Sequence, residues 1–127
     1  MANENRHIRG FRRGIVQPGE KIFCHLEGWQ SLAAGGARDG NMHGILTLTD
    51  RRLCFYRKRL VGHVLWQAEP TALAAVEAGT EVGFRVLRLV TAEDGIVFKT
   101  YARKTDFDMF YTTLNACRSE RPVQEVG

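Results

Sequence analysis

The spacing of apolar residues changes twice along this chain of 127 residues. Near the N-terminus, Ile8, Phe11 and Ile15 recur at intervals of three and four, which is typical of one face of a short helix. Gly10 and Gly14 weaken such a helix, and the Pro-Gly pair at 18–19 ends it. We therefore predict a short helix or basic arm within residues 1–17, a domain over 18–121 and a tail at 122–127.

From residue 20 onward, apolar and polar residues alternate with the period of two that indicates β-strands. The glycine-rich segment 28–43 is predicted to be a long loop. Segment 72–77 is ambiguous, because alanine favours a helix, but its short length and the glycines after it favour a strand. In all, the pattern predicts seven strands, at residues 21–27, 44–49, 52–57, 61–66, 72–77, 84–91 and 96–101.

The last element returns to helical spacing. Thr105, with Asp108 three residues later, predicts a capped helix start. The apolar stripe that follows predicts one face packed on a core, and it consists of Phe107, Phe110, Leu114 and Cys117. Strands followed by one helix predict a mainly β fold, a seven-stranded antiparallel sandwich or partly open barrel capped by the C-terminal helix.

The inward positions of these elements give a predicted core. It comprises Ile22, Leu26, Leu46, Leu48, Leu53, Phe55, Val76, Leu87, Leu89, Phe98, Phe110 and Leu114. The composition, 44% hydrophobic and 25% charged, is that of an ordinary globular protein. No segment reaches the roughly 18 apolar residues that span a bilayer, and the N-terminus lacks a secretory pattern, so we expect a cytoplasmic protein. Cys24, Cys54 and Cys117 are predicted to be reduced thiols, because they are widely spaced and odd in number.

The candidate chemistry does not indicate an enzyme. The four histidines show no spacing typical of metal ligands, and neither serine, at 31 or 119, lies in a nucleophile motif. The glycines of 35–44 form no phosphate-binding sequence. We therefore predict no catalytic residue, no metal site and no cofactor.

Four sequence segments together resemble the bacterial pleckstrin-homology-like (PH-like) domains, the group that includes YokE-like domains. They are Pro18-Gly-Glu-Lys-Ile22, Gly44-Ile-Leu-Thr-Leu-Thr-Asp-Arg-Arg-Leu-Cys-Phe55, Leu73-Ala-Ala-Val76 followed by Gly79, and Gly95-Ile-Val-Phe-Lys99 followed by an aromatic-rich helix. The resemblance covers about residues 18–118. It implies two sheets, strands one to four against five to seven, with the helix at 105–118 over one open end.

The resemblance implies a binding role without naming the ligand, because PH-like domains bind lipids, peptides, proteins or their own copies. PH domains that recognise phosphoinositides place several Lys and Arg residues where the first two strands face each other. This chain has Leu26-Glu27-Gly28 there, which argues against specific phosphoinositide binding.

Basic residues cluster elsewhere on a chain whose net charge is +4. Arg57, Lys58 and Arg59 are predicted to occupy the turn after the third strand, and Arg51-Arg52 the opposite hairpin. Such charges either form a solvated surface that discourages aggregation or contact an anionic membrane or phosphate ligand. The N-terminal arginines Arg9, Arg12 and Arg13 leave three interpretations open: a membrane-surface helix, an arm packed on its own domain or on a second copy, or a frayed tail.

Trp29, Arg38 and His43 are the candidate partner contacts, since they fall in or beside the predicted loop and a large aromatic can anchor a partner. A tryptophan that packs on its own domain is the alternative. The sequence thus predicts a cytoplasmic, non-catalytic module that binds a protein, a peptide or a second copy through a sheet edge or the 28–43 loop. Peripheral binding to anionic membranes ranks second. Nucleic-acid binding ranks third, because strand alternation directs most aromatic residues inward.

Overall fold

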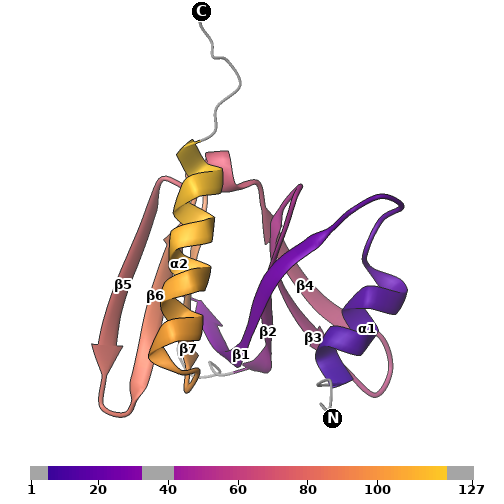
Figure 1. Ribbon diagram of the computed structural model, residues 1–127. Coiled ribbons are helices and arrows are strands. Elements are labelled where there is room, and N and C mark those ends of the chain that lie inside the picture. The colour runs from indigo at the N-terminus through magenta and orange to yellow at the C-terminus, as the bar shows by residue number, and fades with distance from the viewer. Residues whose placement is uncertain (1–5, 33–41, 120–127) are drawn as a thin grey trace, which may run out of the picture.

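The computed structural model describes residues 6–32 and 42–119, and the arrangement of their elements is shown in Figure 1. In chain order the elements are α1 (Arg6–Gly14), β1 (Ile22–Leu32), β2 (Met42–Thr49), β3 (Leu53–Lys58), β4 (His63–Ala68), the short 3₁₀ helix η2 (Pro70–Ala72), β5 (Ala75–Glu81), β6 (Phe84–Val90), β7 (Gly95–Thr100) and α2 (Lys104–Ser119).

The seven strands form one antiparallel sheet in the order β4-β3-β2-β1-β7-β6-β5, which curves around an interior (Figure 1). The predicted fold class, seven antiparallel strands and a C-terminal helix, is confirmed. The separation into two sheets is wrong, because β1 pairs with β2 along Ile22–Gln30 and with β7 along Trp29–Leu32. One long strand therefore joins the two halves.

The main core lies inside the curved sheet and is covered by α2. Leu26, Leu46, Phe55 and Phe98 meet there with the helix residue Phe110, all of them buried. All the predicted core residues except Ile22 and Val76 are buried in this cluster, and Val76 is half-buried against it. Ile22 lies instead with a second cluster, because a β-bulge between Ile22 and Cys24 shifts the alternation of β1 by one residue.

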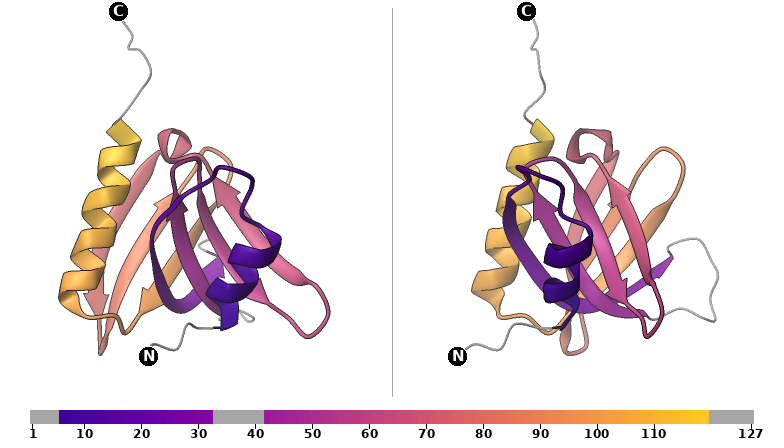
Figure 2. Two further views of the ribbon diagram at one scale, coloured as in Figure 1. Left: turned by 45° about the vertical axis from the view of Figure 1, so that its right-hand side comes forward. Right: turned by 90° about the vertical axis from the view of Figure 1, so that its right-hand side faces the viewer.

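The second cluster lies on the outer face of β2 and β3, under α1 (Figure 2). Ile8 and Phe11 of α1 are fully buried, against Ile45, Cys54 and Tyr56. These strand residues alternate with those of the main core, so the two clusters occupy opposite faces of the sheet. The structure thus packs the N-terminal arm on its own domain.

The strands approach one another closely at Gly28, where β1 passes from β2 to β7. A Cβ atom added there would lie 2.8 Å from Cζ of Phe98 and even closer to the carbonyl oxygen of Lys99. Any side chain at this position would push the two strands apart.

The predicted loop over 28–43 is wrong where the structure describes it. β1 continues to Leu32 and β2 begins at Met42, so residues 28–32, 42 and 43 are in strands. The glycine at 28 suggested a loop, whereas in the structure it permits the close approach of β1 and β7. Residues 33–41, including Arg38, lie outside the described residues.

Two strand boundaries also differ from the prediction. β4 begins two residues later than position 61, because Arg59 to Gly62 forms a turn in which the Arg59 N–H donates to the Gly62 carbonyl at 3.1 Å. The strand predicted at 72–77 lies at Ala75–Glu81, because η2 occupies the chain just after the proline at 70.

The start of α2 corrects the predicted cap. The helix begins at Lys104, which places Thr105 in its first turn. Asp108 accepts a hydrogen bond from Nζ of Lys104 at 2.7 Å, as an ion pair four residues apart. The apolar stripe is as predicted, with Phe107, Phe110 and Leu114 buried.

All three cysteines are free thiols. Cys54 is buried in the second cluster, and burial raises its pKa to about 12. Burial likewise raises the pKa of Cys24 to about 11. Both thiols therefore stay protonated at neutral pH and behave as small apolar side chains. In the described part of the chain, neither helix has the length and hydropathy to cross a bilayer.

A buried ion pair ties the segment after α1 to the β2–β3 hairpin. The Glu20 side chain has no exposed surface, and Arg52 binds both of its oxygens, with Nε at 2.8 Å from Oε2 and a terminal nitrogen at 2.7 Å from Oε1. Thr49 donates its hydroxyl to Glu20 at 2.6 Å, and the Gln17 N–H donates at 2.9 Å. Arg52 also donates to the Ile15 carbonyl. We call this network the Glu20–Arg52 clamp.

The clamp corrects the interpretation of Arg52 as a solvated surface charge. Its partner Glu20 has a pKa lowered to about 2, mainly because Arg52 hydrogen-bonds the carboxylate. Glu20, Thr49 and Arg52 come from two of the segments that resemble PH-like domains, Pro18–Ile22 and Gly44–Phe55. Part of that resemblance therefore has a structural role in holding α1 on the sheet.

Candidate functional site

Three adjoining hollows surround the segment Tyr101–Ala102, which links β7 to α2; together we call them the Tyr101 cleft. Ala102 lines all three hollows, whose volumes are about 420, 330 and 360 Å³. The first lies against the β5–β6 hairpin, including Glu81, Phe84 and Arg85. The second is lined by Glu27, Trp29 and Tyr101, and the third lies between β1 and α2, including Phe23, Asp106 and Met109.

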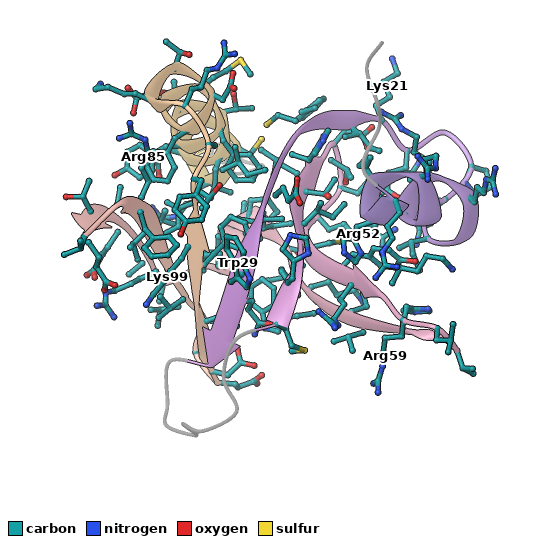
Figure 3. The ribbon with its side chains drawn as sticks, turned by 90° about the horizontal axis from the view of Figure 1, so that it is seen from below. Lys21, Trp29, Arg52, Arg59, Arg85 and Lys99 are labelled. Carbon is teal, nitrogen blue, oxygen red and sulfur yellow. The ribbon has the colours of Figure 1, made fainter. Side chains whose placement is uncertain are left out.

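Aromatic rings form the walls at the centre of the cleft. The Trp29 and Tyr101 rings are 5.4 Å apart with their planes at 87°, and Phe84 stacks on Tyr101 at 4.5 Å. In Figure 3, Lys99 and Arg85 lie on one side of Trp29, and Arg52, Lys21 and Arg59 lie on the other side, which carries α1. Trp29 and Phe84 both project from the outer face of the sheet, which is why residues from β1 and β6 meet.

Exposed apolar side chains border the cleft. Phe23 is 49% exposed, Tyr101 65% and Met109 55%, and each lines one or two of the hollows. Large apolar side chains that remain in water beside a concave surface are typical of a protein-binding site.

The charges around the cleft are unevenly placed. Lys99 pairs with Glu81 at 3.1 Å, and Arg85 donates to the Ala102 carbonyl. The second and third hollows are lined by the carboxylates of Glu27 and Asp106 and, among the described residues, by no Lys or Arg. The third hollow is also lined by His25, and the first by both Glu81 and Arg85. The second and third hollows are therefore the acidic part of the cleft, in a chain that is basic overall.

Two of the three predicted partner contacts lie at this site. Trp29 is in β1 and half-buried, and His43 of β2 packs against it with ring centroids 5.1 Å apart. His43 Nε2 lies 2.8 Å from Oε2 of Glu27. The third, Arg38, lies outside the described residues.

Sequence reasoning missed the other residues of the cleft. Phe23 and Met109 were outward positions of a predicted strand and helix, and an apolar residue at an outward position is itself a signal of a binding surface. Tyr101 and Phe84 carried no such signal, because only the pairing of β6 with β7 brings them together.

The predicted basic residues do not all lie on one surface. Arg6, Arg9, Arg12 and Arg13 occupy the exposed side of α1, which we call the α1 basic face. Lys58 lies beside it, since a Cβ added at Gly10 would be 3.1 Å from Cδ of Lys58. Lys58 is exposed at the end of β3, and Arg59 is in the following turn.

Arg57 differs from its two neighbours in the sequence. It is half-buried, and its guanidinium donates to the His43 carbonyl at 2.8 Å. Arg57 and Lys58 lie on β3 and not in the turn, so they point to opposite faces. The structure therefore brings Lys58, but not Arg57, to the α1 basic face.

His7 fixes the N-terminal end of α1 to β3. The side chain is buried, and its Nδ1 accepts a hydrogen bond from the Lys58 N–H at 3.0 Å, which requires an unprotonated Nδ1. Burial, together with the nearby His43, Arg6 and Arg57, lowers the pKa of His7 to about 4. His7 is therefore neutral at physiological pH.

We expect the stability of the domain to fall as the pH drops from about 6.5 towards 4. The contribution of neutral His7 is fully present above the unfolded pKa near 6.5, and it is lost as the unfolded chain takes up a proton first. The full effect is at most about 3 kcal/mol. Denaturant unfolding at several pH values should show this slope in the native chain and a flatter one in His7→Asn; equal slopes would contradict the assignment.

Within residues 6–32 and 42–119, no three His, Cys, Asp or Glu side chains are placed to share a metal ion. The histidines that meet, His7 and His43, have ring centroids 5.2 Å apart. One is committed to the Lys58 backbone and the other to Glu27. Their arrangement serves packing between α1 and the sheet.

Comparison with known proteins identifies the fold. No protein-family model and no curated protein sequence matches the chain. Among solved structures, it is similar to the Vps36 N-terminal PH domain, with a TM-score of 0.62 and 15% sequence identity over 82% of this chain and 83% of that domain. At this level of identity the similarity concerns the fold alone. The curved seven-stranded sheet closed by α2 is thus a PH-like fold.

Proposed function

We propose that this chain is a non-catalytic binding module that recognises a protein or peptide at the Tyr101 cleft. The observation that carries the proposal is the set of exposed apolar residues Phe23, Tyr101 and Met109 around adjoining hollows. Such residues lose contact with water when a partner docks, which is the main favourable term in protein association. The PH-like fold supports a binding role.

Photo-crosslinking in living cells tests this proposal. We expect benzoylphenylalanine at position 109 to capture a particular protein, or a second copy of this chain if the module self-associates. The matched control is position 60, because Leu60 is fully exposed in the β3–β4 turn and far in the fold from α2.

The captured protein must then bind in purified form. We expect Tyr101→Ala and Met109→Ser each to weaken binding by about 1–2 kcal/mol, or roughly five- to thirtyfold. Leu60→Ser should leave the affinity unchanged. Capture of the same protein from position 60, or equal affinities for all variants, would contradict the proposal.

A second candidate function is supported by the α1 basic face. Packing of α1 on the sheet holds four exposed arginines together and beside Lys58. Each basic group near an anionic leaflet contributes about 1 kcal/mol, so this face is suited to peripheral contact with an anionic membrane surface.

Vesicle sedimentation tests the second candidate. The chain should bind vesicles that contain phosphatidylserine more strongly than neutral ones, and salt should weaken the binding. Replacing Arg9, Arg12 and Arg13 by glutamine should reduce it by at least tenfold. Arg88→Gln on β6 is the control, an exposed arginine on another element. Equal partition of the native chain to both kinds of vesicle would exclude this role.

We also propose that the chain belongs to the bacterial PH-like group and acts in the cytoplasm. The four sequence segments that resemble this group, together with the PH-like fold, support the first point. Cys24 and Cys54 are free thiols, and free cysteines are typical of proteins from a reducing compartment. Fractionation of a bacterial lysate tests the location: we expect the chain in the soluble fraction and not in the membrane fraction.

A further inference from the structure

The hollow between β1 and the β7–α2 link has the features of a cation site. It is lined by the rings of Trp29 and Tyr101, which pack edge to face with their planes at 87°, and by the side chain of Glu27. The negative face of an aromatic ring attracts a Lys or Arg cation, and a carboxylate adds a direct charge partner.

Glu27 is available for such a partner. Its side chain is 52% exposed, and among the described residues its carboxylate has one ion-pair or hydrogen-bond partner, His43, through Oε2. A carboxylate can accept about four hydrogen bonds, so Oε1 can accept from an incoming cation. Two positive side chains of the adjoining strands are already engaged, Lys99 with Glu81 and Arg85 with the Ala102 carbonyl.

The neighbouring hollow between β1 and α2 extends the same surface. It shares Glu27 and Ala102 with the hollow lined by Trp29 and Tyr101. It adds Asp106 and is bordered by the exposed side chains of Phe23 and Met109. Its chemistry suits an apolar residue next to a basic one. A basic segment of a partner would be attracted to this acidic surface, whereas an acidic segment would be repelled.

We propose that a Lys or Arg side chain of a partner protein enters the hollow lined by Glu27, Trp29 and Tyr101, lies against the aromatic rings and pairs with Glu27, while an adjacent apolar residue of the partner packs on Phe23 and Met109. This inference rests on the proposed function, because it specifies the chemistry of the partner at the Tyr101 cleft.

Peptides that differ at one residue test the proposal. Three nine-residue peptides carry leucines on both sides of a central lysine, norleucine or glutamate. The indole N–H resonance of Trp29 is followed by NMR, with Trp66 on β4 as the internal reference. The lysine peptide should shift the indole resonance of Trp29 and not that of Trp66. It should bind at least about fivefold more tightly than the norleucine peptide. The glutamate peptide should bind more weakly than either.

Glu27→Gln should bring the affinity of the lysine peptide down to that of the norleucine peptide. Glu77→Gln is the matched control, an exposed carboxylate of β5 outside the three hollows. Unchanged circular dichroism of both variants shows that the fold is kept. Equal affinities for lysine and norleucine, no shift of Trp29 at millimolar lysine peptide, or unchanged affinity in Glu27→Gln would each overturn the cation site.

The outcome separates this inference from the proposed function. If position 109 still captures a specific protein while lysine shows no advantage over norleucine, the cleft binds a partner by apolar contact alone and the cation site is wrong. If neither is observed, the cleft is not the binding surface and both proposals fail.

Discussion

Glu20→Gln is expected to lower the free energy of unfolding by about 3–5 kcal/mol, because it leaves the Arg52 guanidinium without its charge partner. The carboxylate has no exposed surface, and Arg52 is only 12% exposed, so water can replace the lost partner only in part. The neutral amide also cannot satisfy the donors of Arg52, Thr49 and Gln17 together. Denaturant unfolding monitored by tryptophan fluorescence gives the difference.

A matched substitution controls for the change from glutamate to glutamine. Glu93 is exposed in the β6–β7 turn, and Glu93→Gln should change stability by less than about 0.5 kcal/mol. If the two variants lose equal stability, the clamp does not have the role assigned to it. In the double variant Glu20→Leu with Arg52→Leu, much of the loss should be recovered, since no charge is then left buried.

The clamp also predicts how the free energy of unfolding decreases at acidic pH. The pKa of Glu20 is lowered to about 2, below its ordinary value of 4.5. Its contribution is therefore present above pH 4.5 and is lost as the pH falls towards 2. Glu20→Gln should lack this part of the pH dependence.

The second large effect is expected at Phe11. Phe11→Ala should destabilise the domain by about 3–5 kcal/mol, because the ring is fully buried and its removal leaves a cavity between α1 and the sheet. The ring also packs edge-on against Tyr56 at 5.7 Å and lies 6.0 Å from the guanidinium carbon of Arg52. Thermal and denaturant unfolding measure the loss.

Phe23→Ala is the control for Phe11→Ala, since the same side chain is removed from a position that is 49% exposed. We expect it to cost less than about 1 kcal/mol. Similar losses for both variants would mean that α1 contributes little to the folded domain. A large loss at Phe11 alone would show that α1 is part of the domain and not an appended arm.

The sequence predicted those parts of the fold that depend on local periodicity. Leu46, Leu48, Leu53 and Phe55 alternate in two adjacent strands, and both strands place them in the main core. The stripe in α2 follows from its spacing of three and four. Such patterns depend only on residues that are close in the sequence, so they can be recognised without knowing which strands pair.

Features that depend on distant pairing were not predictable in this way. The bulge after Ile22 moves that residue to the opposite cluster, although its spacing from Leu26 suggested a shared face. The glycine at 28 gave no indication that β1 continues through Trp29. The Tyr101 cleft is assembled from β1, the β5–β6 hairpin and the start of α2, whose meeting depends on the register of the whole sheet.

Because β1 hydrogen-bonds to β2 along one edge and to β7 along the other, losing it would divide the described sheet into two groups of strands. The group β2–β4 and the group β5–β7 would each keep its own ladder but lose half of the apolar interior. We therefore expect neither group to fold alone. The two groups should unfold together, because β1 hydrogen-bonds to both. The central amides of β1 should be among the slowest in the domain to exchange with deuterium, opening only in global unfolding.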